Sequence, residues 1–408
     1  MNTKSLIINA GSSSLKFSLY EMPDKKELIN GNVEKIGLDD SFVTLKLNGK
    51  KITHNYTVKN PSDAALVMIK ELIDNQVIKN INEINDIGHR ILHGGEFYAN
   101  SVVIDEEVLN NISYLTKLGP LHHVGQIAVI KKMQELLPNT PNVAVFDTAF
   151  HQTMPKENYI YAVPYEWYTK YGVRKYGFHG TSHKYITSVM QEKLNKENVN
   201  IISCHLGGGA SVACIKDSKT FDTTMGITPL DGIVMGTRSG SIDPSIITYM
   251  MQETGKSAYE IIDDLNKKSG LAGICSKSDF RDVEDLISKN DENAILAFKK
   301  FRDSVAHAIA NYYVDLDANV DAIIFTAGIG ENVESIRAAV INMLAKSLHL
   351  ELDKVENSKI AKFKEKHEGI ITTSNSSIPV YVIPTDEESM ILNDTYELVH
   401  SKELKLKK

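Results

Sequence analysis

The chain contains one short structural unit twice, about half its length apart. In the central copy, residues 201–215, an apolar run leads into a glycine triplet at 207–209 and is followed by alternating polar and apolar residues. This pattern predicts a strand, a tight turn and a second strand. The earlier copy occupies 6–20, with Gly11 at the position of Gly207. Because such recurrence is typical of a duplicated fold, we expect an α/β chain whose two halves face each other across a cleft.

Both glycine turns are predicted to bind phosphate. Consecutive glycines let the backbone adopt positive φ angles, so that successive N–H groups can point toward one anion. Taken alone, such a glycine triplet is more commonly a hairpin turn without a ligand. Two such turns facing one cleft favour a nucleoside triphosphate. The same superposition places Asn9 on His205.

A third glycine-rich stretch, 322–332, predicts a buried strand, a Gly-x-Gly turn and a helix from Ser335. Two common nucleotide motifs do not fit the chain. The P-loop pattern fails because Met250 occupies its first glycine position. The dinucleotide fingerprint fails because Val212 and Val333 stand where its third glycine is required.

Composition restricts the classes of partner. The net charge of −7 argues against nucleic acid and anionic membranes. No apolar run approaches the roughly 18 residues of a membrane span, and the N-terminus lacks a signal-peptide core. Three cysteines form no disulfide framework, and Cys204 and Cys214 are expected to be buried thiols in the central hairpin. We therefore expect a cytoplasmic protein.

Local signals place several elements. Asn48-Gly49 between two strand patterns predicts a type I′ hairpin. The buried strand 141–146 is expected to deliver Asp147 at its carboxyl end, where α/β sheets hold their ligands. Thr181 or Ser182 is expected to cap a helix that runs to about Leu194. A last helix is predicted at 387–399.

Four further blocks accompany the glycine-rich stretches. They are Gly88-His-Arg-Ile-Leu-His-Gly-Gly95, Val145-Phe-Asp-Thr-Ala-Phe-His151, Tyr176-Gly-Phe-His-Gly-Thr-Ser-His183 and Met235-Gly-Thr-Arg-Ser-Gly240. In this order, and from Leu6 to about Thr395, the blocks resemble the acetokinase family. The resemblance implies two duplicated actin/Hsp70-like (ribonuclease H-like) domains with a nucleotide cleft between them. It also implies an enzyme that transfers phosphate between ATP and a short-chain carboxylate.

The resemblance sets the expected domain boundaries and partners. In the family the C-terminal helix returns to the first domain. We therefore expect an N-terminal acetokinase domain at 1–146 plus 385–408, and a C-terminal nucleotide-binding domain at 147–384. The family also implies a homodimer, direct in-line transfer, and closure of the cleft by domain motion.

A carboxylate is already a nucleophile, so its phosphorylation needs charge neutralisation and alignment more than acid–base catalysis. Arg90, beside Gly94 and Gly95, and Arg238, in a small-residue loop, carry planar guanidinium groups that suit carboxylates and phosphoryl groups. Taken alone, either could be a surface charge. The resemblance implies that Arg90 contacts acetate and that Arg238 stabilises the transition state.

His179 precedes a predicted helix and could donate a hydrogen bond to phosphoryl oxygens or simply begin the helix. His179 and His183 also have the i, i+4 spacing of a zinc pair, but Gly180 replaces the glutamate of that motif, so zinc is not expected. His205 is expected to shape the phosphate loop. Structural roles are expected for His122, His123 and His151.

The remaining site residues follow from the resemblance. It makes Asp147 catalytic, orienting Arg90 or the substrate carboxylate. It places Mg²⁺, for which Mn²⁺ could substitute, at Asn9 and Glu387, whose oxygen atoms suit that ion. The small apolar acyl pocket would be lined by Leu92, Leu121, Phe178 and Pro229. The nucleotide would be bound by Lys16, His205, Leu206, Gly207, Gly208, Gly209, Asp279, Phe280, Arg281, Gly328, Ile329, Gly330, Glu331 and Asn332.

Four positions depart from the family pattern: His123, Gly208, Ser241 and Asp386. They leave the choice between acetate and propionate open, so a propionate kinase of the same family is the near alternative. A non-transferring ATPase or nucleotide sensor on the same fold is the distant one. Two arginines and a small apolar pocket would not be needed for that function. A phosphoenzyme formed on a carboxylate such as Glu387 is the minor mechanistic alternative.

Overall fold

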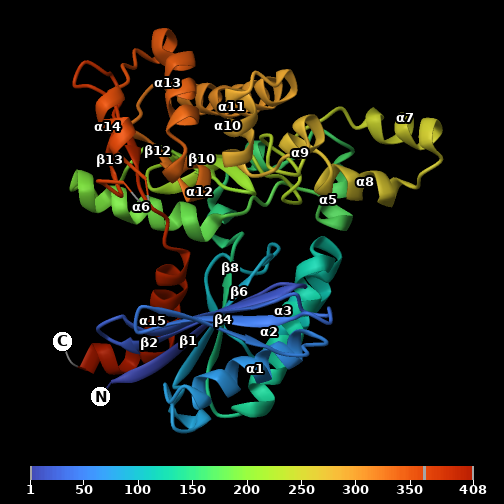
Figure 1. Cartoon of the computed structure of the whole chain (residues 1–408), viewed down its shortest axis with the longest axis vertical. Helices are drawn as coiled ribbons and strands as arrows, with labels where there is room; N and C mark the ends of the chain where they lie inside the picture. Colours follow the sequence, from blue (N-terminus) through green and yellow to red (C-terminus); the bar gives the residue numbers. More distant parts are fainter. Residues whose placement is uncertain (1, 362–363, 407–408) are drawn as a thin grey trace. The chain divides into compact units, whose positions relative to one another are not determined.

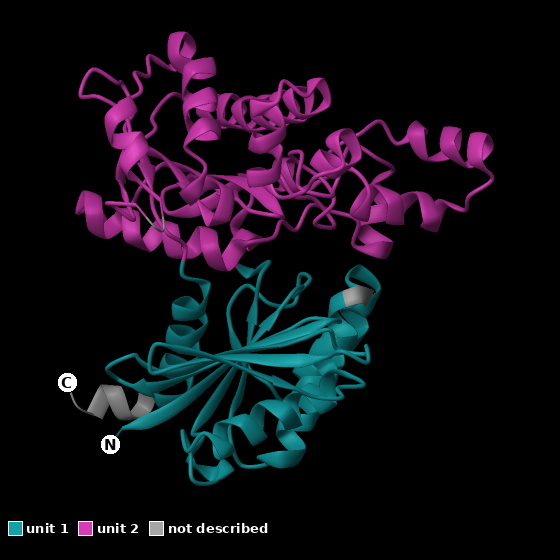
Figure 2. Cartoon of the chain, in the orientation of Figure 1, with its two compact units in different colours: residues 1–149, 386–408 teal, residues 150–385 magenta. Residues whose placement is uncertain are grey.

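The computed structural model describes residues 2–361 and 364–406. The chain forms two compact units, one comprising Met1–Ala149 with Asp386–Lys408 and the other Phe150–Thr385 (Figure 2). Among the described residues, no helix is both long and apolar enough to cross a membrane.

Unit 1 is built on an eight-stranded sheet with the order β5-β4-β3-β2-β1-β6-β8-β7 (Figure 1). Its strands are β1 (Thr3–Ala10), β2 (Ser14–Met22), β3 (Lys26–Glu34), β4 (Phe42–Leu47), β5 (Lys50–Asn55), β6 (Asp86–Ile91), β7 (Val102–Val103) and β8 (Asn142–Phe146). Its helices are α1 (Pro61–Asp74), α2 (Glu106–Tyr114), α3 (Pro120–Leu136), α15 (Glu387–Leu406) and the short 3-10 helices η1 (Ile81–Glu83) and η2 (Leu115–Leu118).

Unit 2 is built on a six-stranded sheet with the order β11-β10-β9-β12-β14-β13. Its strands are β9 (Ile201–Leu206), β10 (Ala210–Lys216), β11 (Lys219–Thr223), β12 (Ala322–Thr326), β13 (Gly369–Ile370) and β14 (Val380–Val382). The 3-10 helix η3 (Ala149–Thr153) starts at the boundary with unit 1. The helices are α4 (Lys156–Tyr159), α5 (Tyr165–Tyr171), α6 (Gly180–Leu194), α7 (Ser245–Thr254), α8 (Ala258–Lys267), α9 (Gly270–Cys275), α10 (Phe280–Ser288), α11 (Glu292–Asp315), α12 (Ala327–Asn332), α13 (Glu334–Leu348) and α14 (Lys354–Lys359).

The two sheets share one topology, which confirms the predicted duplication. β1 is antiparallel to β2 and parallel to β6, which is parallel to β8. In the same way, β9 is antiparallel to β10 and parallel to β12, which is parallel to β14. The helices α6 and α15 follow β8 and β14 along the chain. α6 nevertheless packs against β9 of unit 2, and α15 against β1, β6 and β8 of unit 1. Each of these helices thus covers the sheet of its own unit, although each follows a strand of the other unit along the chain.

Side-chain alternation decides which face of each sheet carries the candidate residues. In β1, Leu6 and Ile8 enter the core beneath α1 and α3, whereas Ile7 packs with residues of α15. Asn9 lies two residues beyond Ile7 and therefore projects toward the face that α15 covers. Val145, two residues before Asp147, also packs with α15.

The same alternation applies in unit 2. Ile201 of β9 and Ala213 of β10 pack with Ile186 of α6. His205 and Ser211 therefore lie on the face that α6 covers, at the end of the hairpin.

The predicted Asn48-Gly49 hairpin is confirmed, with φ angles of 51° and 75° and with Leu47 paired to Lys50. The prediction of positive φ in the glycine triplet 207–209 is wrong, because none of the three adopts it. The missing side chain of Gly209 instead allows Arg238 to come close to the turn, because a Cβ on Gly209 would lie 3.2 Å from Arg238 Nη1.

Two further local predictions are wrong. The Gly-x-Gly segment Gly328–Gly330 lies inside the short helix α12, and not in a turn. α6 has His179 at its N-cap position, with a left-handed φ of 56°, where Thr181 or Ser182 was expected. Ser182 lies in the first turn, and its hydroxyl bonds to Nδ1 of His205 instead.

The packing of α15 on β6 depends on Gly88. A Cβ at this position would collide with Thr395 Oγ1 and lie 2.9 Å from Ile7 Cδ1. We predict that Gly88→Ala lowers the free energy of unfolding by about 1–3 kcal/mol, as overpacking in a core does. Urea denaturation measures the loss.

Gly328→Ala serves as the matched control, because nothing lies within 4 Å of the added Cβ and alanine favours the helix. Equal stability of the two variants would contradict the proposed collision.

Candidate active site

In unit 1, a buried ion pair forms where three parallel strands end. Asp147 follows β8 and is completely buried, and its Oδ2 accepts a hydrogen bond from Arg90 Nη2 at 3.0 Å. Arg90 Nε lies 3.8 Å from Glu387 Oε2, at the first residue of α15. The arginine thus lies between two carboxylates, one fully buried and one 27% exposed. Its guanidinium is held at this edge of the sheet and can bind an anion.

The charges of this cluster do not balance. Burial alone would lower the pKa of Arg90, but the carboxylates of Asp147 and Glu387 raise it above its usual value. Burial raises the pKa of Glu387, and the charge of Asp147 adds to this rise against the opposing effect of Arg90. Lys16 and Glu388 also act on Glu387, so that three carboxylates face two cationic side chains. The cluster would therefore be stabilised by a further cation.

The polar groups near Glu387 could hold such a cation. Asn9 pairs in register with Lys16 across the β1–β2 hairpin, on the face that α15 covers. The side chain of Lys16 also lowers the pKa of Glu387, so the two charges are close. An amide oxygen and a carboxylate of raised pKa form a donor set that suits Mg²⁺, which keeps several of its waters. Asp386 accepts a hydrogen bond from Ser389 N at 2.9 Å and caps α15, a role in which Asp and Asn are equivalent.

The acyl-pocket candidates of unit 1 lie just beyond β6. Leu92 is buried, and a Cβ on Gly119 would lie 2.9 Å from its Cδ2. Gly119 also adjoins His123, which is buried and whose Nδ1 lies 3.1 Å from Ile112 O. Burial lowers the pKa of His123, so this histidine is neutral. The side chain of Leu121 lies outside the described part of the structure.

In unit 2, His179 and Arg238 converge on the glycine hairpin. A Cβ on Gly209 would lie 3.2 Å from Arg238 Nη1 and 3.5 Å from His179 Nε2. Arg238 Nη1 also donates to the carbonyl of Pro229 at 3.3 Å, and burial lowers its pKa. Phe178 is buried, and its carbonyl accepts a hydrogen bond from His151 Nε2 at 2.9 Å. A guanidinium and an imidazole thus approach one turn of small residues.

The nucleotide candidates at 279–281 differ in exposure. Asp279 caps α10 and pairs with exposed Arg281 at 2.5 Å. Phe280 is buried and contacts the rings of Phe298 and Phe301, so its side chain belongs to the core. In this segment, only Asp279, Arg281 and the backbone can therefore contact a nucleotide.

Helix α12 is held by Arg337, a residue that the sequence analysis missed. Its guanidinium is fully buried and donates to the carbonyls of Gly330 and Glu331 at 3.0 and 2.8 Å. Its other nitrogens donate to Asn357 and Ile360. Burial lowers the pKa of Arg337 to about 10. Glu331 in turn accepts a hydrogen bond from Thr385 N. Arg337 therefore fixes the carboxyl end of the short helix that carries five of the predicted nucleotide contacts.

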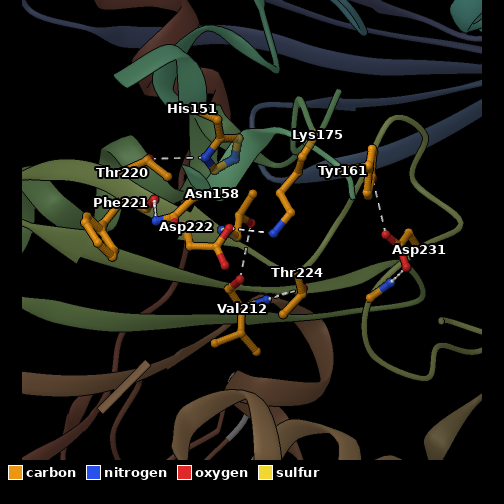
Figure 3. A network of polar contacts seen from close by, with 12 residues as sticks. His151, Asn158, Tyr161, Lys175, Val212, Thr220, Phe221, Asp222, Thr224 and Asp231 are labelled. Carbon is orange, nitrogen blue, oxygen red and sulfur yellow. Dashed lines mark hydrogen bonds and ion pairs between the residues drawn. The ribbon is translucent and has the colours of Figure 1, made fainter. Parts of the chain in front are cut away.

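A cavity of about 830 Å³ lies elsewhere in unit 2 and is lined by none of the predicted site residues. Lys175 and Asp222 form an ion pair of 2.6 Å at its wall, and Tyr161 donates to Asp231 (Figure 3). Asp231 also accepts from Ser241 Oγ at 2.6 Å, and this bond closes the loop that carries Arg238. Ser241, one of the four departures from the family pattern, thus has a structural role. No sequence motif pointed to this cavity.

In both histidines of the zinc-like pair, ring nitrogens lie within hydrogen-bond distance of serine hydroxyls. His183 has Ser203 Oγ at 2.9 Å from Nδ1 and Ser211 Oγ at 2.9 Å from Nε2. His179 Nδ1 lies 2.9 Å from the same Ser211 hydroxyl. The described residues include no group of three or more His, Cys, Asp or Glu side chains arranged for a metal ion.

Comparison with known proteins agrees with this geometry. Residues 4–393 match the acetokinase family. The acetate kinase of Geobacillus sp. (strain WCH70) is 48% identical over 401 residues, which cover 98% of this chain and 99% of that protein. A solved propionate kinase from Francisella tularensis has a TM-score of 0.91 at 41% identity and covers 97% of this chain and 100% of its own. For the acetate kinase of Porphyromonas gingivalis the TM-score is 0.90 at 38% identity, with the same coverage.

Because the pKa of Glu387 is raised, its ionised carboxylate lowers the free energy of unfolding of the ligand-free protein. Its folded pKa lies above its unfolded pKa, so the native state binds more protons between these two values and stability falls there as pH rises. We predict that Glu387→Gln is more stable than the parent at neutral pH, and that the difference disappears below about pH 4. Thermal unfolding between pH 4 and pH 8 in the absence of divalent cations measures both curves. If the difference in stability between the two proteins is the same at all pH values, the charge of Glu387 is not responsible for it.

Proposed function

The chain belongs to the acetokinase family, and on this premise we propose that it catalyses reversible, Mg²⁺-dependent phosphoryl transfer from ATP to acetate, giving acetyl phosphate and ADP. The observation that carries the proposal is the convergence of Arg238 and His179 on Gly209 of the central hairpin. A cation and an imidazole directed at a turn of small residues form a site for a phosphoryl group. This enzyme is a phosphotransferase with a carboxyl group as acceptor.

The roles of the residues follow from the charge changes of the reaction. An acetate oxygen forms a bond to the γ-phosphorus while the bond from that phosphorus to its bridging oxygen breaks, and the electron pair leaves with ADP. Arg90, held by Asp147, binds the acetate carboxylate. Arg238 and His179 neutralise charge on the transferring group. The carboxylate has no proton to remove, so no general base is required.

We assign the magnesium site to Asn9 and Glu387. The imbalance of the Arg90 cluster supports this, because a divalent cation would compensate the excess of carboxylates over cationic side chains around Glu387. When bound, the ion neutralises phosphate charge and orients the nucleotide. Lys16 lies on the same face and would contact a phosphate. The protein is further proposed to act in the cytoplasm as a homodimer; light scattering tests the latter.

Propionate is the alternative acceptor. The similarity to a propionate kinase at a TM-score of 0.91 supports it, whereas the close packing of Leu92 against Gly119 favours a methyl group. One methylene changes transition-state binding by only about 1–3 kcal/mol, so both acids should react.

We predict that Mg·ATP with acetate yields acyl phosphate, which hydroxylamine traps as a coloured hydroxamate. The rate with propionate should be lower than the rate with acetate by a factor of about ten or more, and the rate with butyrate should be lower still. ATP hydrolysis without hydroxamate would contradict the proposal, and faster reaction with propionate would establish the alternative.

We predict that Arg238→Ala lowers kcat by about 10³-fold or more, as for arginines that neutralise phosphoryl charge. Arg302→Ala is the matched control, because Arg302 forms only a partly exposed pair with Asp303. The control should retain activity within about twofold. A loss of less than tenfold in a folded Arg238→Ala protein would remove this residue from the mechanism.

A further inference from the structure

A chain of buried hydrogen bonds connects His179 to the interior of unit 2. Ser203 Oγ lies 2.9 Å from His183 Nδ1, and His183 Nε2 lies 2.9 Å from Ser211 Oγ. Ser211 Oγ is also 2.9 Å from His179 Nδ1. Ser203, His183 and Ser211 are completely buried.

We propose that Ser203, His183 and Ser211 form a one-way hydrogen-bond relay that keeps the proton of His179 on Nε2, the nitrogen nearest Gly209. The relay makes His179 a hydrogen-bond donor and excludes it as an acceptor at that atom. Its catalytic consequence rests on the proposed kinase function, but the proton position does not.

The direction of the relay follows from its buried end. The Ser203 hydroxyl has His183 Nδ1 as its one side-chain partner among the described residues. A buried hydroxyl whose proton finds no acceptor is unfavourable, so Ser203 donates to Nδ1. Nδ1 therefore carries no proton.

Neutral His183 then carries its proton on Nε2. Burial, together with neighbouring His151 and His205, lowers the pKa of His183 well below its usual value, so the ring stays neutral. Its Nε2–H donates to Ser211 Oγ. Ser211 must direct its own proton to its remaining partner, Nδ1 of His179.

The opposite direction would give the opposite chemistry. If His183 donated from Nδ1, Ser211 would donate back to His183 and accept from His179 Nδ1–H. His179 Nε2 would then present a lone pair near the guanidinium of Arg238 and toward any phosphoryl oxygen. Two electron-rich atoms would face each other, which disfavours phosphate binding. The buried position of Ser203 selects the donor form.

The proton position can be measured without substrate. The protein has 13 histidines, so histidine-selective ¹⁵N labelling gives a tractable long-range ¹H–¹⁵N spectrum. The signals of His179 are assigned by their loss in His179→Gln. We expect Nε2 to be protonated and Nδ1 to be an unprotonated acceptor in the parent protein. A protonated Nδ1 on neutral His179 would overturn the proposal.

Three variants separate positioning from folding. Ser211→Ala removes the donor to His179 and should give a mixture of both tautomers. Ser203→Ala removes the buried end and should have the same effect through His183. Ser211→Thr keeps the hydroxyl and should restore the parent spectrum. Val212→Ala is the matched control, because it deletes buried atoms of the same strand without touching the relay. Unchanged spectra in Ser211→Ala and Ser203→Ala would overturn the proposal.

Kinetics provide the second readout. Ser211→Ala should lower kcat about tenfold or more, the effect of losing one partner of a buried hydrogen bond, with smaller changes in KM. Ser211→Thr should recover most of this loss. If the spectra behave as expected but no variant or parent forms acyl phosphate, the relay stands and the proposed function fails. If the parent protein forms acyl phosphate but its His179 is protonated on Nδ1, the proposed function stands and the relay fails.

Discussion

The buried carboxylate of Asp147 is the constraint on which the rest of unit 1 depends. A carboxylate without access to water is strongly unfavourable unless it is paired, and Arg90 supplies the pair at 3.0 Å. Because Arg90 lies on β6 and Asp147 follows β8, the pair requires the parallel register of these strands. The same register leaves Arg90 Nε near Glu387. The guanidinium is thereby held in one orientation, which would remove an entropic cost from the proposed reaction.

The duplicated scaffold carries different chemistry in its two halves. The ends of β1 and β9 are equivalent, yet Asn9 lies at one and His205 at the other. Around Asn9 the polar groups are charged or are oxygen ligands, which suits a cation and a carboxylate. Around His205 they are imidazoles and hydroxyls, which suit phosphoryl oxygens. One helix covers the equivalent face of each sheet, α15 carrying Glu387 in unit 1 and α6 carrying His183 in unit 2.

Local sequence was sufficient for the features that depend on neighbours in the chain. It predicted both glycine hairpins, the Asn48-Gly49 turn and the strand that ends before Asp147. It failed where the cause is distant. Gly209 is a glycine because Arg238 approaches it, and Arg337 holds α12 from the next helix. Ser203 and Ser211 meet His183 only through the β9–β10 register, so a lone serine in either strand gives no signal. The catalytic roles themselves came from family resemblance.

The proposed direction of the relay suits a carboxylate as the acceptor of the phosphoryl group. A carboxylate attacks phosphorus without losing a proton, so an imidazole that accepted a proton at Nε2 would serve no step of the transfer. Charge on the phosphoryl oxygens is instead stabilised by donors fixed in advance. Arg238 can only donate, and a relay that begins at buried Ser203 would restrict His179 to the same role. Enzymes that phosphorylate alcohols must remove a proton, and a relay of this direction would not assist them. The orientation of one buried hydroxyl would thus be matched to a nucleophile that carries no proton.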